Sequence, residues 1–318
     1  MTVRHLTGPG ELDLFCRLSY LLDHELADDL AAGRRRPTAM WVALEGDRLL
    51  ARAAWWTSAA GRDPLALDCL DVFDVDDTLP DPYRSEVALR LLETATAQVV
   101  PAGAPRPEYG RFLPSDWRED PAARAVVENR TRVLERTGAR LLVERLRLEW
   151  RAGTPVPADD GTLVFRPADD REELLSLMTA VLEGTLDAHS RAELDSGMSA
   201  REAAERQYAE ELTAYASPRA WWRIAQLPYT GEPVGFVIPA RNSYRPIIAY
   251  IGVLPAHRGR GHVDRILAEG TRVLAAEGVE QIRAATDVAN VPMARAFERA
   301  GYVNFARAIN MVWDAEAG

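Results

Sequence analysis

Two segments of the sequence repeat each other, and this repeat limits the chain to folds built from two similar parts. Residues 132–150 are RVLERTGARLLVERLRLEW, and residues 295–313 are RAFERAGYVNFARAINMVW. The identities that recur at one constant offset are Arg132/Arg295, Glu135/Glu298, Arg136/Arg299, Gly138/Gly301 and Trp150/Trp313. Each segment predicts a helix that ends at a C′ glycine, followed by a strand that ends in tryptophan. The shared spacing indicates a tandem duplication.

The chain is long enough for two hydrophobic cores. It has 318 residues, and single cores stop growing at roughly 250–300 residues. Residues 151–161, RAGTPVPADDG, have two prolines and two glycines and no apolar periodicity. This composition predicts a linker. We therefore expect one domain over residues 1–150 and a second over residues 162–318.

Strand and helix patterns alternate in the second half, which predicts an α/β domain. Its expected strands lie at 162–167, 220–227, 233–240, 245–255 and 279–288. Its expected helices lie at 169–216, with breaks near Gly184 and Gly197, after Gly261, and from Pro292 to Gly301. The first half repeats this order, with strands at 2–6, 40–44, 48–56 and 67–75 and helices at 11–31 and 84–98.

Composition excludes several function classes. All 38 basic residues are arginine, so neither Schiff-base catalysis by lysine nor a Walker A loop is available. The net charge of −10 argues against nucleic-acid binding. Cys16 and Cys69 are expected to be free thiols, and the five histidines show no zinc spacing, so we expect no metal. No apolar run of membrane-spanning length and no signal peptide is found, so a cytoplasmic location is expected.

The segment VLPAHRGRGHVDRIL at 253–267 joins a buried strand to an amphipathic helix through two glycines and two arginines. A turn of this kind points several backbone N–H groups, and the positive end of the helix dipole, into one concavity. Gly259 and Gly261 leave room for phosphate oxygens, and Arg258 and Arg260 can add charge-assisted contacts. The pattern predicts a diphosphate site. A solvated surface loop is the alternative.

These residues resemble the acyl-CoA signature of the GNAT superfamily of N-acetyltransferases, Gln/Arg-x-x-Gly-x-Gly/Ala after a strand that ends in Val-x-Pro. Here the signature is Arg258-Gly-Arg-Gly261-His-Val263, and the block from Asn290 to Tyr302 resembles the next family block. The resemblance implies an α/β fold of two tandem GNAT-like domains. Each would have a mixed, mostly antiparallel sheet that is flanked by helices and has a splayed central strand.

The resemblance also implies acetyl-CoA as the acyl donor and assigns residues to it. Backbone groups of Ile251, Gly252 and Val253 would pair with the pantetheine arm, and a backbone N–H near Val253 would polarise the thioester carbonyl. The loop that would hold the diphosphate consists of Arg258, Gly259, Arg260, Gly261, His262, Val263 and Asp264. Asn290 would contact the donor through its amide, and the alternative is that it caps the following helix. His257 and His262 are expected to be exposed.

Two positions depart from the family pattern. Val263 stands where the signature has Gly or Ala, and Phe297 stands where many relatives have a tyrosine that protonates the leaving thiolate. Ala285 also replaces a glutamate that serves some relatives as the base. The remaining candidates for the base are Asp287, Tyr250, His189 and Glu193. For the segment that holds Asp187 and His189, a solvated loop is the alternative.

In the first half, the place of the diphosphate turn is taken by DVFDVDDTLPDPYRSE, in which no glycine occurs. Its aspartates are Asp71, Asp74, Asp76, Asp77 and Asp81, and their charge would repel a diphosphate. We therefore expect the first domain to lack a donor site and to serve as a scaffold, as a wall for the acceptor or as the surface of a homodimer.

The expected function is transfer of an acetyl or short acyl group from acetyl-CoA to an amine of a small molecule. No nucleic-acid or membrane partner is expected, and a homodimer is compatible with the sequence. Two alternatives stay open. The chain could be a non-catalytic acyl-CoA-binding module, or an enzyme of this fold that acylates oxygen or hydrolyses the thioester.

Overall fold

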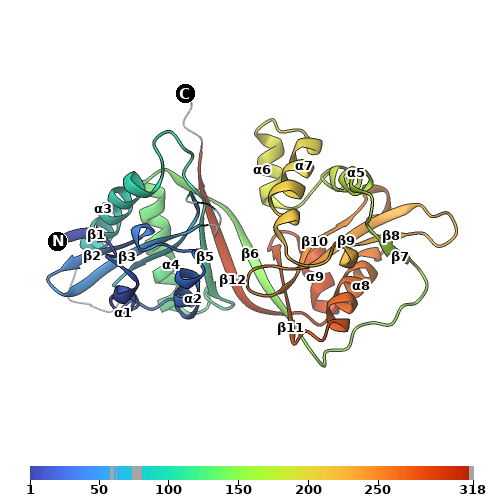
Figure 1. Ribbon diagram of the computed structural model, residues 1–318, viewed down its shortest axis with the longest axis horizontal. Coiled ribbons are helices and arrows are strands. Elements are labelled where there is room, and N and C mark those ends of the chain that lie inside the picture. The colour runs from blue at the N-terminus through green and yellow to red at the C-terminus, as the bar shows by residue number, and fades with distance from the viewer. Residues whose placement is uncertain (58–60, 62, 74–80, 315–318) are drawn as a thin grey trace. The chain divides into compact units, whose positions relative to one another are not determined.

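The structure is a computed structural model that describes residues 1–57, 61, 63–73 and 81–314 (Figure 1). The chain divides into two compact units. Unit 1 comprises Met1–Glu144 and Arg307–Gly318, and unit 2 comprises Arg145–Ala306. The predicted division into two parts is present, but its boundaries differ from the predicted ones.

The difference lies in two strands, β6 (Ala139–Arg151) and β12 (Val303–Trp313). The unit boundaries fall inside both, so each strand begins in one unit and ends in the other. The predicted domains 1–150 and 162–318 are therefore corrected: residues 145–150 belong to unit 2, and residues 307–318 belong to unit 1. The physical reason is burial, because Trp150 packs in the core of unit 2 and Met311 packs in the core of unit 1.

Unit 1 has the strand order β1-β2-β3-β4-β5-β12. Its own strands are β1 (Thr2–His5), β2 (Met40–Glu45), β3 (Arg48–Thr57), β4 (Pro64–Val72) and β5 (Tyr109–Pro114). Its helices are α1 (Leu12–Phe15), α2 (Leu26–Ala31), α3 (Asp81–Val99) and α4 (Pro121–Arg136). The helix predicted over 11–31 is thus interrupted between Phe15 and Leu26.

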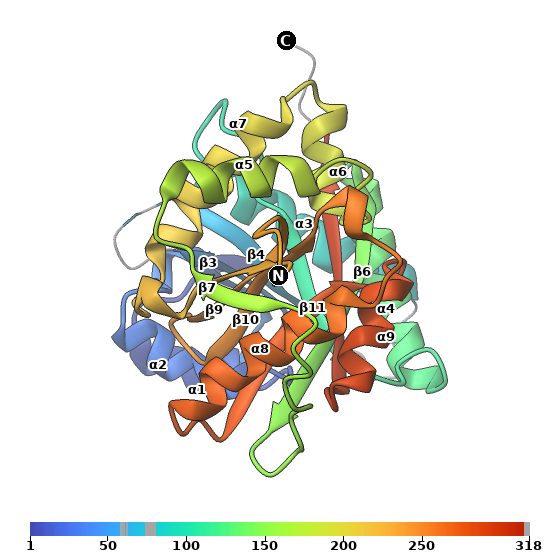
Figure 2. The same ribbon diagram turned by 90° about the vertical axis from the view of Figure 1, so that its right-hand side faces the viewer.

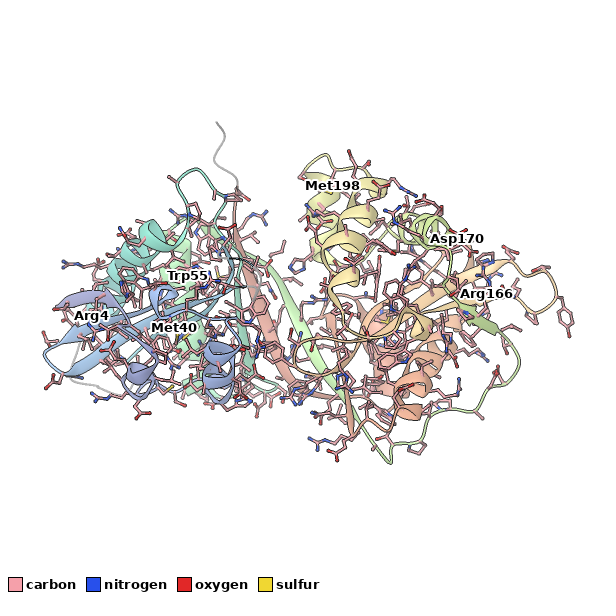
Figure 3. All side chains as sticks on the ribbon, in the orientation of Figure 1. Arg4, Met40, Trp55, Arg166, Asp170 and Met198 are labelled. Carbon is pink, nitrogen blue, oxygen red and sulfur yellow. The ribbon has the colours of Figure 1, made fainter. Side chains whose placement is uncertain are left out.

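Unit 1 has two hydrophobic cores, one on each face of its sheet, because apolar side chains point alternately to the two faces along the strands. Trp41 and Trp55 pack with α3 and α4 on one face of the sheet. Met40 and Ala54 pack with α1 and α2 on the other face, since successive strand residues point to opposite faces. Figure 3 shows Met40 and Trp55 in the interior of this unit.

Unit 2 has the strand order β6-β11-β10-β9-β8-β7. The other strands are β7 (Val164–Pro167), β8 (Arg223–Gln226), β9 (Pro233–Arg241), β10 (Pro246–Val253) and β11 (Gln281–Asp287). The helices are α5 (Arg171–Val181), α6 (Ala188–Asp195), α7 (Ala200–Glu210), α8 (His262–Ala276) and α9 (Val291–Arg299). Only β10 and β11 pair in parallel within this sheet, and the predicted mixed, mostly antiparallel sheet is confirmed.

Helices cover both faces of the unit 2 sheet (Figures 1 and 2). Phe236 and Ile238 pack with α5 and α7, whereas Val237 packs with α8 and α9 on the opposite face. Side-chain caps fix where these helices begin. Asp170 accepts from two amides at the start of α5, and Ser199 and Glu202 form a capping box at the start of α7.

The repeated helix–glycine–strand segment is confirmed in both halves. Gly138 follows α4 with φ 88°, and Gly301 follows α9 with φ 80°. Both values lie in the left-handed region that glycine adopts most readily, which ends each helix and starts the next strand.

Candidate active site

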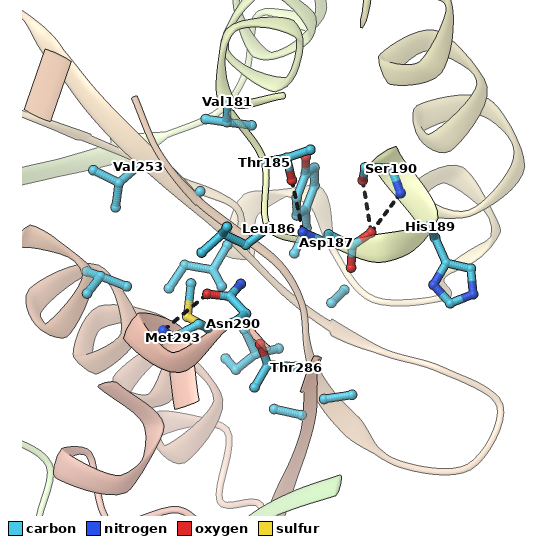
Figure 4. A pocket seen from close by; sticks show the side chains of 18 of the residues that line it. Val181, Thr185, Leu186, Asp187, His189, Ser190, Val253, Thr286, Asn290 and Met293 are labelled. Atoms are coloured by element: carbon cyan, nitrogen blue, oxygen red, sulfur yellow. Dashed lines mark hydrogen bonds between the residues drawn. The ribbon is translucent and has the colours of Figure 1, made fainter. Parts of the chain in front are cut away.

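A cavity of about 900 Å³ lies in unit 2 beside β10 (Figure 4). The sequence-predicted residues that line it are His189, Glu193, Tyr250, Ile251, Gly252, Val253, Arg258, Gly259, Gly261, His262, Val263 and Asn290. Arg260, Asp264 and Asp287 do not line it. Most of the predicted donor and base residues are therefore brought to one cavity, although they come from four separate segments of the chain.

One edge of β10 has no strand partner along most of its length. β10 pairs with β9 as far as Val253↔Gly235, whereas its pairing with β11 has one register position, Ile247↔Arg283. Beyond Ile247 the two strands diverge, and the predicted splayed central strand is confirmed. Main-chain groups on this edge can pair with an extended amide chain as if it were another strand.

The loop after β10 forms a cluster of unpaired amides. Gly259 and Gly261 both have φ 75°, and Gly261 is the N-cap of α8. Within the described residues, no backbone oxygen accepts from the N–H groups of 259–263, whereas the N–H of Asp264 donates to Gly261 O at 3.2 Å. Five amides and the positive end of the helix dipole therefore form an anion site without Asp264.

Arg258 does not serve the anion site with its side chain. Its guanidinium donates to three carbonyl oxygens: Val253 O at 3.1 Å, Glu183 O at 2.6 Å and Val181 O at 2.8 Å. These contacts tie the amide loop to the end of β10 and to the C-terminus of α5. The predicted phosphate contact from this side chain is therefore corrected to a positioning role. Arg260 is exposed and does not line the cavity.

The prediction that His257 and His262 are exposed is wrong. Their exposed fractions are 5% and 9%. His257 Nε2 lies 3.0 Å from Glu232 Oε1, and the two imidazole rings are 6.2 Å apart. Burial lowers the pKa of His262, and His257 adds to this effect.

Asn290 caps α9, where its Oδ1 accepts from the Met293 N–H at 3.4 Å (Figure 4). The expectation that Asn290 caps the helix is therefore confirmed, and both residues also line the cavity. Phe297 lines the same wall and has no proton to donate. The nearby Tyr302 hydroxyl does not replace it, because it lies within hydrogen-bond distance of Thr271 Oγ1, at 2.8 Å.

Asp287 is corrected from a candidate base to a structural group. It is 1% exposed, and its Oδ2 accepts from the Ala188 N–H at 2.7 Å, at the start of α6. Its Oδ1 lies 3.1 Å from Arg145 Nε. Burial raises the pKa of Asp287, and the hydrogen bond from Ala188 opposes this shift. The carboxyl group anchors a helix and does not reach the cavity wall.

The other candidate bases do line the cavity. The segment that holds Asp187 and His189 is capped helix, not loop: Asp187 is the N-cap of α6 and accepts from Ser190 N and Oγ (Figure 4). Figure 4 shows His189 on the far side of Asp187 from Asn290. Glu193 forms an ion pair with Arg206.

Tyr250 packs edge-on against Phe236, with ring centroids 5.0 Å apart. Burial raises the pKa of Tyr250, and the carboxylates of Asp187, Glu211 and Glu193 raise it further. The raised pKa favours the protonated hydroxyl, which suits a proton donor better than a base.

Sequence reasoning missed several residues of the cavity wall. Glu210, Glu211, Tyr215 and Asn242 line it, and they come from the end of α7 and from the loop before β10. Their sequence context, EELTAYASP and ARNSYRP, contains no motif. Only the fold brings these side chains to the cavity.

The described residues hold no group of three or more His, Cys, Asp or Glu side chains that could bind a metal ion. None of the described helices is long and apolar enough to cross a membrane.

Comparisons with known proteins agree with this geometry. Residues 186–302 match the model of the Acetyltransferase (GNAT) family. A GCN5-related N-acetyltransferase from Sphaerobacter thermophilus has a similar structure, with a TM-score of 0.60 and 15% identity over 98% of this chain and 94% of that chain. No curated protein matches the sequence.

Two further structures are similar. A tandem GNAT protein from the clavulanic acid biosynthesis pathway matches with a TM-score of 0.50 and 15% identity, over 100% of this chain and 99% of that chain. The glucosamine N-acetyltransferase region of a fungal multi-domain β-N-acetylglucosaminidase matches with a TM-score of 0.56 and 13% identity, over 98% of this chain and 38% of that chain. At these identities the likeness shows the fold, which is a tandem GNAT fold.

Proposed function

Because residues 186–302 form an acetyltransferase domain of the GNAT family, we propose that the protein transfers an acetyl or short acyl group from acetyl-CoA to an amine of a small molecule. The observation that carries this proposal is that two binding surfaces follow each other without a break. The unpartnered edge of β10 leads directly into the unpaired amides of 259–263, and both lie on one cavity. A diphosphate joined to an extended amide arm has this order of groups.

The residues present fit such a donor. The amides of Gly259, Arg260, Gly261, His262 and Val263 would hold the diphosphate, and Ile251, Gly252 and Val253 would pair with the amide arm. A main-chain N–H near Val253 would polarise the thioester carbonyl. Val263, on the first turn of α8, narrows this approach compared with Gly or Ala. The acceptor would enter from the side of α6 and α7.

We also propose that only unit 2 binds a donor. In unit 1, β4 and β5 pair in parallel with one register position, Leu67↔Tyr109, so these strands diverge as β10 and β11 do. There, however, the Leu70 carbonyl already accepts from Arg130 Nε at 2.9 Å and from Arg111 Nη1 at 3.4 Å. Side chains of the protein itself take the main-chain group that a pantetheine would need. The aspartates Asp74, Asp76 and Asp77 lie outside the described residues.

Titration calorimetry with CoA tests the donor site. Gly261→Asp would place a side chain at φ 75° and a carboxylate among the five amides. We expect CoA binding to fall below detection. Gly278→Asp is the matched control, because Gly278 has φ 71°, open space around it and a place outside the cavity wall. Unchanged affinity in Gly261→Asp would contradict the site.

A thiol-release assay with an amine panel tests the reaction. Release that depends on an amine supports transfer. Release without any acceptor would indicate thioester hydrolysis, and binding without release would indicate a non-catalytic module. Release that depends only on alcohols would indicate transfer to oxygen.

A further inference from the structure

Two carboxylates on the acceptor side of the cavity, those of the exposed residues Glu210 and Glu211, have no ion-pair partner among the described residues, and hydrogen bonds hold Glu211 in place. Of the lining carboxylates, Glu193 is paired with Arg206, and Asp187 caps α6 and lies 3.7 Å from Arg145. Glu211 has neutral partners only: Tyr215 Oη donates to its Oε1 at 2.7 Å, and Gln207 Nε2 donates to its Oε2 at 3.4 Å. Among the described residues, no cation lies within ion-pair distance of Glu211.

The surroundings of Glu211 favour a cation at this place. Glu211 follows the last residue of α7, where the helix dipole is negative, and the exposed Glu210 beside it also lines the cavity. Burial raises the pKa of Tyr215, and the Glu211 carboxylate raises it further, so this hydroxyl keeps its proton and holds the carboxylate in position.

Glu211 lines the same cavity as the part of β10 where the reaction is expected. Its carboxylate is one of the three that raise the pKa of Tyr250, which precedes the Ile251–Val253 edge. Tyr250, Tyr215 and Glu211 line one cavity together. Besides Glu211 and Tyr215, the charged or titratable groups of the cavity wall are Arg145, Arg147, Asp187, His189, Glu193, Arg206, Glu210, Tyr250, His257, Arg258, His262 and Arg283.

Resting on the proposed function, we propose that Glu211 binds the acceptor as an ammonium ion and is the base that takes its proton, while Tyr215 positions Glu211. The acceptor class that this site selects is an aliphatic primary amine, which is protonated in free solution, and not an aromatic amine or an alcohol.

The step balances as follows in atoms and charge. The ammonium gives one proton to the Glu211 carboxylate, and the neutral nitrogen attacks the thioester carbonyl carbon. A C–N bond forms and the C–S bond breaks. The thiolate leaves and takes the second amine proton, and Glu211 later releases its proton to solvent.

The test compares Glu211→Gln with Glu277→Gln in the full-length protein. For Glu211→Gln we expect CoA affinity within about twofold of wild type, and kcat/KM for aliphatic primary amines lower by about 10²- to 10⁴-fold. We also expect the fall of kcat/KM on the acid side of the pH profile to flatten, which a structural role alone would not produce. Glu277→Gln is expected to keep the activity and the wild-type pH profile, because Glu277 is an exposed residue that ends α8 as Glu211 ends α7, but it does not line the cavity.

Several results would overturn the inference. Equal losses in Glu211→Gln and Glu277→Gln would indicate general electrostatics. A flattened profile in Glu210→Gln, Glu193→Gln or His189→Asn instead would place the base elsewhere. If the wild-type protein acylates aromatic amines as fast as aliphatic ones, the proposed selection of aliphatic primary amines is wrong. If wild type acylates no amine, the proposed function fails with the inference; if Glu211→Gln equals an active wild type, the inference fails alone.

Tyr215→Phe gives a second test that does not depend on the stability of Glu211→Gln. It keeps the carboxylate and removes its hydrogen-bond donor. We expect kcat/KM to fall by about 2- to 10-fold while the acid-side fall of the profile remains. Unchanged kcat/KM would contradict the positioning role.

Discussion

Asp71 is expected to be the charge on which the stability of unit 1 depends most. It is 1% exposed, and three buried guanidiniums surround it: Arg52 Nε at 2.9 Å, Arg111 Nη2 at 2.9 Å and Arg130 Nη2 at 3.0 Å. Asp23, 2.9 Å from Arg52, is a second carboxylate in this cluster. Removing Asp71 would leave buried cations without their shared partner.

The expected cost follows from this burial. Breaking a buried pair by removing one partner costs about 3–5 kcal/mol, which lowers the melting temperature of a unit of this size by about 6–20 °C. We therefore expect Asp71→Ala to shift the unit 1 transition in differential scanning calorimetry by this amount. Glu86→Ala is the control in the same unit. Its pair with Arg136 is exposed on both sides, so we expect less than about 1 kcal/mol.

The pH dependence of this effect has a defined sign. Burial alone would raise the pKa of Asp71, but Arg111, Arg130 and Arg52 together lower it well below its usual range. A carboxyl whose pKa is lower in the folded state stabilises the fold above the unfolded pKa of about 4 and loses this contribution as the pH falls below it. The stability difference between wild type and Asp71→Ala should therefore narrow below about pH 4. A difference under 1 kcal/mol at pH 7 would refute the reasoning.

Two further predictions concern the donor site. Titration of the full-length chain with CoA should give a stoichiometry near one CoA per chain, because Arg111 and Arg130 occupy the gap between the diverging strands β4 and β5 of unit 1. A value near two would contradict this. Arg258→Ala should weaken CoA binding by about 10- to 100-fold, because the amide loop loses three charge-assisted hydrogen bonds. The exposed neighbour Arg260 provides the control Arg260→Ala, and an equal or larger loss there would show that Arg258 does not position the loop.

Local chemistry made the donor site predictable from the sequence. The strand, the two glycines and the helix are consecutive, so their geometry depends on backbone rules that a short segment contains. The roles of long side chains were not predictable in this way. Arg258 reaches carbonyls about 75 residues away in the chain, and Asp287 accepts from an amide 99 residues away. Such contacts exist only after the elements have packed.

The acceptor side was not predictable for a related reason. Glu211 and Tyr215 lie on the irregular chain after α7, and no fixed spacing connects them to β10. The predicted domain boundaries were wrong for a different physical reason. Periodicity shows that residues 139–151 and 303–313 are strands, but it does not show which sheet each end of a strand joins.

Comparing equivalent positions explains how one fold gives two outcomes in this chain. By the constant offset of the repeat, Arg130 in unit 1 is equivalent to Met293 in unit 2. Tyr109 and Arg283 hold equivalent positions in the two parallel strand pairs, so Arg111, two residues after Tyr109, is equivalent to Ala285, two residues after Arg283. Met293 and Ala285 are uncharged and line the cavity of unit 2. In unit 1 the same two positions carry guanidiniums, which cannot stay buried without a counter-charge, and Asp71 on β4 provides it. The diverging strands are therefore kept in both units, and the side chains at these two positions determine whether the gap is filled from within or left open as a cavity.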